Sequence, residues 1–304
     1  MSTPSSNIAA PSLHPATRRL ALFAADIKIS HTIFAMPFAL LSTFLAACGW
    51  PKGGQLLLIV LCMICARTVA MAMNRLLDAR LDALNPRTFG RAIPAGALSR
   101  GFFVAAVVLC SVAFMAATSG FWFWYRNAWP VTLSLPVLAF LSAYPLLKRF
   151  TRLCHYYLGA ALALAPVCAW VAIRGDMGWP PLVMAAAVLL WTAGFDIIYA
   201  CQDYQSDVQT GVLSVPAKLG ISRALCLARL THVGSAAMLL LLGRVVPQFG
   251  LLYHVGAALA ITLLVVEHTL VKADDLSKVG LAFFTINGII SVILGTLGIL
   301  DVFF

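Results

Sequence analysis

Two stretches of the sequence repeat carboxylate side chains at helical spacing. Asn74, Asp78 and Asp82 are four residues apart, so on an α-helix they would share one face. A second stretch repeats this arrangement over eleven residues, with the polar side chains of Asp196, Tyr199, Asp203 and Asp207. Carboxylate oxygens suit Mg²⁺, which takes one or two carboxylates together with phosphate oxygens. Two such faces opposite each other would hold metal ions around a diphosphate.

Basic side chains accompany both stretches and would neutralise the remaining phosphate charge. They are Arg75, Arg87, Arg91, Lys148 and Arg149. The chemistry that this set indicates is ionisation of an allylic diphosphate, with cations stabilising the leaving group in the transition state. A single pair of aspartates at a helix end is usually a solvated cap or an ion pair. Two acidic faces at one depth are much harder to explain in that way.

The composition shows what kind of scaffold must carry these residues. Of 304 residues, 62% are hydrophobic and 11% are charged, against about 25% charged in soluble proteins. The chain is therefore an all-α integral membrane protein, and soluble enzyme folds are excluded. Long apolar runs also exclude an outer-membrane barrel. The net charge of +10 reflects membrane topology, and we expect no nucleic acid partner.

Nine segments are long and apolar enough to span a bilayer, which takes about 20 residues each. We place them at 24–48, 54–80, 99–119, 128–148, 155–173, 180–203, 221–243, 249–270 and 279–302. Residues 1–16 are rich in Ser, Pro and Ala and are predicted to form a disordered tail. Residues 17–304 are predicted to form a single transmembrane domain.

The basic residues predict the orientation of this domain in an inner (cytoplasmic) membrane. Of 21 Lys and Arg residues, all but Lys52, Arg126, Arg174 and Arg244 lie on the side of the N-terminus. The positive-inside rule makes that side cytoplasmic. Both acidic stretches end on the same side, so the site is expected to face the cytoplasm.

These motifs together resemble those of the UbiA-type intramembrane aromatic prenyltransferases. The first signature is Asn74, Asp78 and Asp82, followed by the Asn85-Pro86-Arg87-Thr88 stretch. The second is Asp196 to Asp207 followed by Ser214-Val215-Pro216, and Tyr144 with Lys148 match a third element. The resemblance implies nine helices in a ring around a central cavity, and Mg²⁺-dependent transfer of a polyprenyl group from its diphosphate to an acceptor.

The resemblance also implies roles for individual residues. It implies Mg²⁺–diphosphate roles for Asn74, Asp78, Asp82, Asp203 and Asp207, with Asp78 and Asp203 central to catalysis. Diphosphate contacts are implied for Arg75, Lys148, Tyr144 and, in the loop, Arg91. Many relatives carry Asp directly after the motif Asn, where this chain has Arg75. This form resembles the branch that prenylates 4-hydroxybenzoate, and a closely similar branch prenylates a dihydroxynaphthoate in menaquinone synthesis.

Residues deeper in the membrane are candidates for binding the aromatic acid. Asp196, about 10 Å deeper than Asp203, is a candidate base for the phenolic proton, unless it only hydrogen-bonds Tyr199 or a neighbouring helix. Arg67 lies two turns deeper than Asn74 and would pair with the acceptor carboxylate.

Each of these assignments has a structural alternative. Arg67 would otherwise bond backbone carbonyls or an acid such as Glu267, which we expect to be an interfacial charge. His31 and Tyr199 are further candidates for the acceptor pocket, although His31 also fits an ordinary hydrogen-bonded histidine. His232 and His268 have no partner at ligand spacing and receive no role.

One class other than an enzyme also uses acidic residues inside a membrane protein: a cation-coupled transporter with an acidic, cation-binding site. Such proteins place their site near the midplane, between inverted repeats. Here the two acidic helices have the same orientation, and their acids lie at the inner ends. A transporter would also have no reason to carry both loop motifs, so a transferase is favoured.

Overall fold

The computed structural model describes residues 15–28, 32 and 34–304, and every regular element in these ranges is a helix. Within these described ranges, eight helical segments are long and apolar enough to cross a membrane. Five of them are single helices: α3 (Gly53–Leu84), α4 (Arg100–Tyr125), α5 (Trp129–Leu147), α6 (Cys154–Arg174) and α10 (Ile221–Val245). A sixth is α11 (Leu251–Leu270). These bounds match six predicted spans to within a few residues.

The other two long segments are interrupted by short turns of different helical type. α7 (Trp179–Ala200) continues through the 3₁₀ turn η2 (Cys201–Asp203) into α8 (Tyr204–Thr210). α12 (Val279–Leu281) continues through the π-helical turn η3 (Ala282–Ile286) into α13 (Asn287–Asp301). A short helix, α9 (Val215–Leu219), follows Ser214, whose hydroxyl caps its first turn by accepting a hydrogen bond from the backbone N–H of Ala217.

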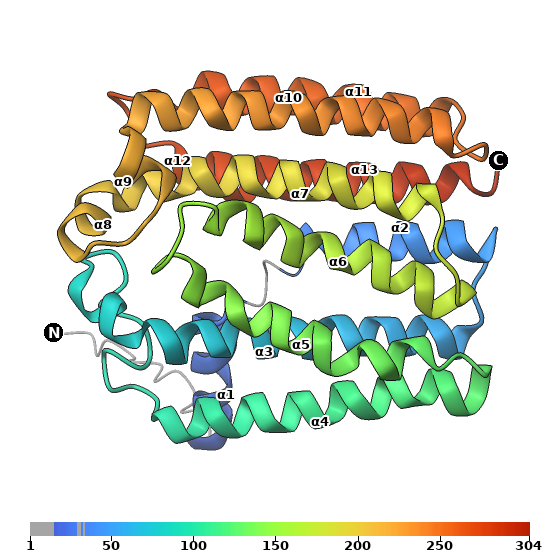
Figure 1. The fold of residues 1–304 in the computed structure, drawn as a ribbon, viewed down its shortest axis with the longest axis horizontal. Coiled ribbons are helices and arrows are strands. Elements are labelled where there is room, and N and C mark those ends of the chain that lie inside the picture. The colour runs from blue at the N-terminus through green and yellow to red at the C-terminus, as the bar shows by residue number, and fades with distance from the viewer. Residues whose placement is uncertain (1–14, 29–31, 33) are drawn as a thin grey trace, which may run out of the picture.

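The predicted first span, 24–48, is wrong as a single helix. The structure has α1 (Pro15–Asp26) and a separate, shorter apolar helix, α2 (Met36–Ala47). In Figure 1, α1 runs crosswise to the long helices. Its charged residues Arg18 and Arg19 are exposed, as expected for a helix at a membrane surface rather than inside the bilayer.

Two other predictions concern this region. The predicted tail, 1–16, lies mostly outside the described residues, but α1 already begins at Pro15. The candidate His31 lies outside the described residues.

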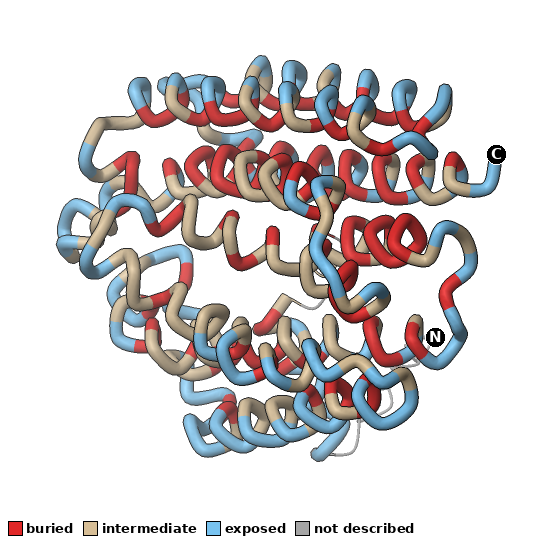
Figure 2. Tube along the Cα trace, turned by 45° about the vertical axis from the view of Figure 1, so that its right-hand side comes forward, coloured by how far each residue is buried: buried red, intermediate tan, exposed pale blue. Residues whose placement is uncertain are grey.

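The long helices pack in chain order as a ring (Figure 1). α13 packs on α2, and α2 packs on α3, which closes the ring. α2 also packs against α6 and so divides the interior. On one side, α7, α10, α11 and α13 enclose a solid core that includes Trp191 and Tyr253. Figure 2 shows the buried faces of the helices turned inward and the exposed faces outward. The open space lies on the other side, among α3, α4, α5 and α6.

A close contact between α6 and α7 fixes two elements of the site. A Cβ added at Gly159 on α6 would lie 2.3 Å from the carbonyl oxygen of Leu189 on α7. Only glycine permits this approach without a shift of the backbone. The contact brings the inner ends of α6 and α7 together, where the candidate residue Asp196 lies.

Candidate active site

Asp78 on α3 is the most deeply buried acid of the first motif, with 1% of its side chain exposed. Its Oδ2 accepts hydrogen bonds from Asn74 Nδ2 at 2.9 Å and from Lys148 Nζ at 2.6 Å. Lys148 directly follows α5, so the ion pair joins two helices that the sequence separates by 70 residues. Among the described residues, Asp78 Oδ1 has no hydrogen-bond partner although it is buried.

Asp203, the last residue of the turn η2 between α7 and α8, is held by the loop that follows α3. Its Oδ1 accepts hydrogen bonds from Asn85 Nδ2 and from Arg87 Nε, both at 2.8 Å. Arg87 also donates to the hydroxyl of Tyr199 at 2.9 Å. Burial opposes the charged form of the Arg87 guanidinium, but the hydrogen bond and the charge of Asp203 outweigh it and raise the pKa of Arg87. Arg87 is therefore a permanent cation between the two motifs.

Asp78 and Asp203 line one cavity, and the remaining motif acids line it too. Arg91 Nη1 donates to both carboxylate oxygens of Asp82, at 2.7 and 2.8 Å. Asp207 on α8 also lines this cavity. The structure thus brings together all four acids that the sequence assigned to metal binding, and pairs three of them with basic side chains.

The Arg75 side chain is buried and hydrogen-bonded to other residues of the protein. Only 3% of its side chain is exposed, and it donates to Asn74 Oδ1 at 2.6 Å and to Asp26 Oδ2 at 3.1 Å. Asp26, at the end of α1, also accepts from the backbone N–H of Ala92 at 2.8 Å. The predicted contact of Arg75 with a diphosphate stays a prediction, and its observed contacts position Asn74 and the loop after α3.

Asp196 lies one to two turns deeper than Asp203 and pairs with a residue that the sequence analysis missed. Its Oδ2 is 2.7 Å from His155 Nδ1 on α6. The other ring nitrogen, Nε2, accepts a hydrogen bond from the backbone N–H of Val215 at 3.2 Å. Both Asp196 and His155 line the inner cavity. Asp196 thus hydrogen-bonds a neighbouring helix and also faces the cavity, so its role as the base stays a prediction.

Two cavities adjoin at the centre of the molecule. The inner cavity, of about 240 Å³, is lined by the acids and by the basic residues paired with them. A second space, of about 190 Å³, runs outward between α3, α4, α5 and α6 and is lined almost wholly by apolar side chains. We call it the apolar groove. The two spaces share six lining residues: Arg67, Met71, Asn74, Tyr144, Leu158 and Leu162.

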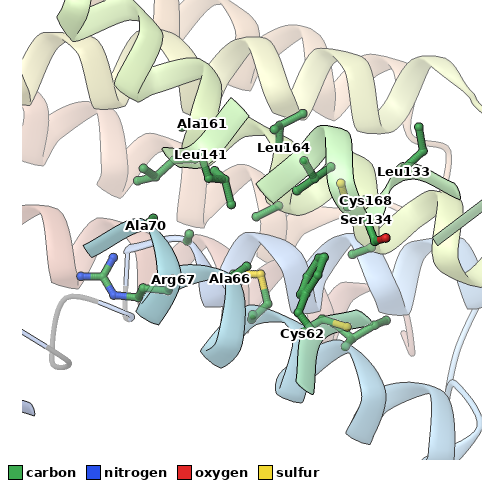
Figure 3. Close-up of a pocket in the computed structure, with 18 of the residues that line it drawn as sticks. Cys62, Ala66, Arg67, Ala70, Leu133, Ser134, Leu141, Ala161, Leu164 and Cys168 are labelled. Carbon is green, nitrogen blue, oxygen red and sulfur yellow. The ribbon is translucent and has the colours of Figure 1, made fainter. Parts of the chain in front are cut away.

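Arg67 lies where the two spaces meet, and Figure 3 shows its guanidinium at one end of the groove lining. Its Nη2 donates to the carbonyl oxygen of Lys28 at 3.3 Å. Its buried Nε has no hydrogen-bond partner among the described residues. Glu267, the acid considered as an alternative partner, instead accepts a hydrogen bond from Asn287. The prediction that Glu267 is an interfacial charge is wrong, because it is 0% exposed.

The donor set of the inner cavity fits a magnesium ion. Its acids offer oxygen ligands, and the buried Asp78 Oδ1 accepts no hydrogen bond from the described residues. In the described ranges no three acidic, His or Cys side chains lie close enough to form a ready-made metal site. A diphosphate would have to complete the coordination, as expected for Mg²⁺, which is bound through one or two carboxylates and substrate phosphates.

A model of the UbiA prenyltransferase family matches residues 35–289 of this chain. The chain belongs to this family. It is a prenyltransferase and a multi-pass membrane protein, as its motifs and spans indicated. The UbiA match includes both acidic motifs, Arg67, and the His155–Asp196 pair.

Curated relatives in the UbiA family support the assignment. The chain is 30% identical over 220 residues to a 4-hydroxybenzoate octaprenyltransferase of Pseudomonas aeruginosa (strain LESB58), covering 72% of each chain. It is 28% identical over 249 residues to the enzyme of the same name from Nitrosospira multiformis, covering 80% of this chain and 82% of the relative.

Solved UbiA structures share the fold. The apo structure of a UbiA homolog from Aeropyrum pernix K1 matches with a TM-score of 0.80 and 29% identity, covering 90% of this chain and 98% of that one. A UbiA homolog from Archaeoglobus fulgidus bound to GPP and Mg²⁺ matches with a TM-score of 0.70 and 17% identity, covering 93% and 100%. At that identity the second match supports the fold alone.

Proposed function

We propose that this chain transfers a polyprenyl group from polyprenyl diphosphate to the ring of a hydroxy-aromatic carboxylic acid, in the biosynthesis of ubiquinone or menaquinone. The first candidate acceptor is 4-hydroxybenzoate. The reaction depends on Mg²⁺ and occurs at the cytoplasmic face of the inner membrane. The observation that carries the proposal is the junction of an acid- and base-lined cavity with an apolar groove, with Arg67 at the junction.

The donor fits these two spaces in one orientation. Its diphosphate lies in the inner cavity, and its apolar chain lies in the groove. Lys148, Arg87 and Arg91 pair with the motif acids in the structure, and they turn toward phosphate oxygens when the donor binds. Asp78, Asp82, Asp203 and Asp207 would hold magnesium, which neutralises the diphosphate and makes it a better leaving group. The C1–O bond of the donor breaks, and its electron pair leaves with the diphosphate.

The acceptor lies deeper, between Arg67 and Asp196. The Arg67 guanidinium pairs with the carboxylate of the acid, because its Nε is buried without a protein partner in the described chain. Asp196 Oδ1 accepts no hydrogen bond from the described residues, and it takes the phenolic proton while the neighbouring ring carbon forms a bond to C1. The released diphosphate then takes the proton of that ring carbon, and Asp196 returns its proton to the ring oxygen, which restores the phenol. Tyr199 lines the same cavity, and its hydroxyl accepts a hydrogen bond from Arg87, which also binds Asp203.

A dihydroxynaphthoate is the alternative acceptor, since its aromatic ring system also carries both a hydroxyl group and a carboxylate. Curated relatives named 4-hydroxybenzoate octaprenyltransferase favour the benzoate. The acceptors are separated by incubating the purified protein in lipid with Mg²⁺, a polyprenyl diphosphate and one acid at a time. We expect a product whose mass equals 4-hydroxybenzoate plus the prenyl group, and far less product from the naphthoate. A product from the naphthoate alone contradicts the benzoate assignment.

A further inference from the structure

A buried polar cluster lies behind the inner cavity, where α7, α10, α11 and α13 meet. Glu267 and Asn287 are both 0% exposed. Asn287 Nδ2 donates to Glu267 Oε1 at 3.1 Å, and Asn287 Oδ1 accepts from the indole of Trp191 at 2.6 Å. A buried carboxylate inside a membrane protein is costly, and neither motif uses this one. The cluster therefore needs a role of its own.

The histidines of this cluster extend it across α10 and α11. His232 Nε2 lies 3.1 Å from the carbonyl oxygen of Trp191. A carbonyl only accepts, so this nitrogen carries the proton, and in the neutral ring Nδ1 accepts. His268 Nε2, 2.9 Å away, then donates to it. Through His232 and His268, the cluster thus joins the backbone of α7 to α10 and α11.

Asn287 directly follows the π-helical turn η3 and bonds to it. Its Nδ2 also donates to the carbonyl oxygen of Ala282, the first residue of the turn, at 3.0 Å. A π-helical turn contains one more residue than an α-helical one, and such turns are frequent at functional sites. One residue corresponds to about 100° of helix rotation. Without the turn, the faces before and after it could not both keep their contacts.

The residue that this turn presents to the inner cavity is Phe283. It lines the inner cavity, and its ring centroid lies 4.1 Å from that of Tyr199 and 5.3 Å from that of Phe195. Tyr199 in turn accepts the hydrogen bond of Arg87, which holds Asp203. The turn therefore connects the buried cluster to the aromatic wall of the site.

We propose that Glu267 and Asn287 are positioning residues that hold the π-helical turn and so keep the Phe283 ring against Tyr199 in the inner cavity. An aromatic wall beside the reacting carbon excludes water and favours a cation over its face. Loosening the turn lets water reach the prenyl cation. Its C1 then bonds to water oxygen, a proton is lost, and prenyl alcohol forms in place of the coupled product. The kinetic part of this inference rests on the proposed prenyl transfer, and the structural part does not.

The structural part is tested by hydrogen exchange of the whole protein in lipid. Asn287→Ala should raise exchange of the backbone amides of residues 282–290 at least tenfold and leave α3 and α6 unchanged. Ser235→Ala is the matched control, because it removes another buried hydrogen bond, to the carbonyl of Ala187 at 2.9 Å, away from the turn. Unchanged exchange at 282–290 in Asn287→Ala, or an equal rise in Ser235→Ala, overturns the proposal.

The kinetic part is tested by the ratio of prenyl alcohol to coupled product. Asn287→Ala and Phe283→Ala should each raise this ratio on the order of tenfold. The double variant should raise it no further, because both changes remove the same contact, that of the Phe283 ring with Tyr199. Glu267→Gln keeps an acceptor oxygen for Asn287 and should keep the wild-type ratio, whereas Glu267→Leu should not. Multiplying effects in the double variant, or equal effects of Gln and Leu, overturn the proposal. If the wild type transfers nothing to an aromatic acid, the proposed function fails, and the exchange result alone decides this inference.

Discussion

His155 orients the Asp196 carboxylate by a hydrogen bond from a neighbouring helix. The Nδ1 atom of His155 lies 2.7 Å from Asp196 Oδ2, and the backbone N–H of Val215 donates to Nε2 at 3.2 Å. An amide N–H only donates, so Nε2 carries the lone pair and Nδ1 carries the proton. The imidazole therefore donates from Nδ1 to Asp196 Oδ2. Val215 begins α9, in the second motif's loop, so this loop sets the tautomer beside the candidate base.

The first prediction concerns this pair. Asp196→Asn should lower kcat by about 10²–10⁴-fold, the usual contribution of a general base. It should leave the affinity for polyprenyl diphosphate and Mg²⁺ nearly unchanged, because Asp196 lies deeper than the motif acids. His155→Ala should cost less, about tenfold to a hundredfold, since it removes one hydrogen bond to a charged group. Both are checked by steady-state kinetics with binding of an unreactive diphosphate analogue. An equal loss of diphosphate affinity in Asp196→Asn would place Asp196 in the metal site instead.

The second prediction concerns magnesium. Asp78→Asn and Asp203→Asn should each lower turnover by about 10²-fold or more, because both remove charge that holds the metal–diphosphate complex. The Mg²⁺ concentration at half-maximal rate should rise in each. Asp176→Asn is the matched control, an exposed acid paired with Arg174 at the outer end of α6, and it should behave as wild type. Near-normal activity at ordinary Mg²⁺ in both motif variants contradicts the assignment.

The third prediction concerns acceptor recognition. Arg67→Leu should raise the KM for the aromatic acid by about tenfold to a hundredfold, the value of a charged hydrogen bond pair. The KM for the uncharged amide or ester of that acid, and for the diphosphate, should hardly change. The measurement is the ratio of the acid and amide KM values in wild type and variant. If acid and amide suffer alike, Arg67 has a structural role and the carboxylate partner must be sought elsewhere.

The fourth prediction concerns the apolar groove. Ala165 on α6 lines this groove, so Ala165→Phe should obstruct long prenyl chains and spare short ones. We expect kcat/KM to fall at least tenfold more for an octaprenyl than for a geranyl donor, because a filled groove loses the chain's apolar burial. Leu109→Phe is the control, since Leu109 on α4 faces outward with 71% of its surface exposed. Equal losses for both donors would place the chain outside this groove.

The sequence predicted the acidic faces because their spacing is local. Asp78 follows Asn74 by one turn on a single helix, and the structure keeps them bonded at 2.9 Å. The positive-inside count placed both acidic stretches at one end of the bundle, and α3 and α7 do end there. The spans also followed from apolar length alone, except for the first, where the helix breaks between α1 and α2.

The contacts that sequence reasoning missed join residues far apart in the chain. Asp26 meets Arg75 across 49 positions, and His155 meets Asp196 across 41. No periodicity carries such a pairing. A weak signal existed for His155, a polar residue at the start of an apolar span that also needs a partner once buried. Glu267 lay near a predicted inner helix end, which suggested an interface, but the packing of α11 against α13 buries it.

The central claim is that one site both releases diphosphate and forms the carbon–carbon bond to the aromatic acid. It is tested most directly by measuring both products in one sample of the purified protein in lipid, with Mg²⁺, an octaprenyl diphosphate and 4-hydroxybenzoate. We predict equal molar amounts of diphosphate and of prenylated acid in the wild type, a fall of both by about 10²-fold or more in Asp78→Asn, and neither product after removal of Mg²⁺. Diphosphate release without any prenylated acid, whichever acid is supplied, would contradict the account.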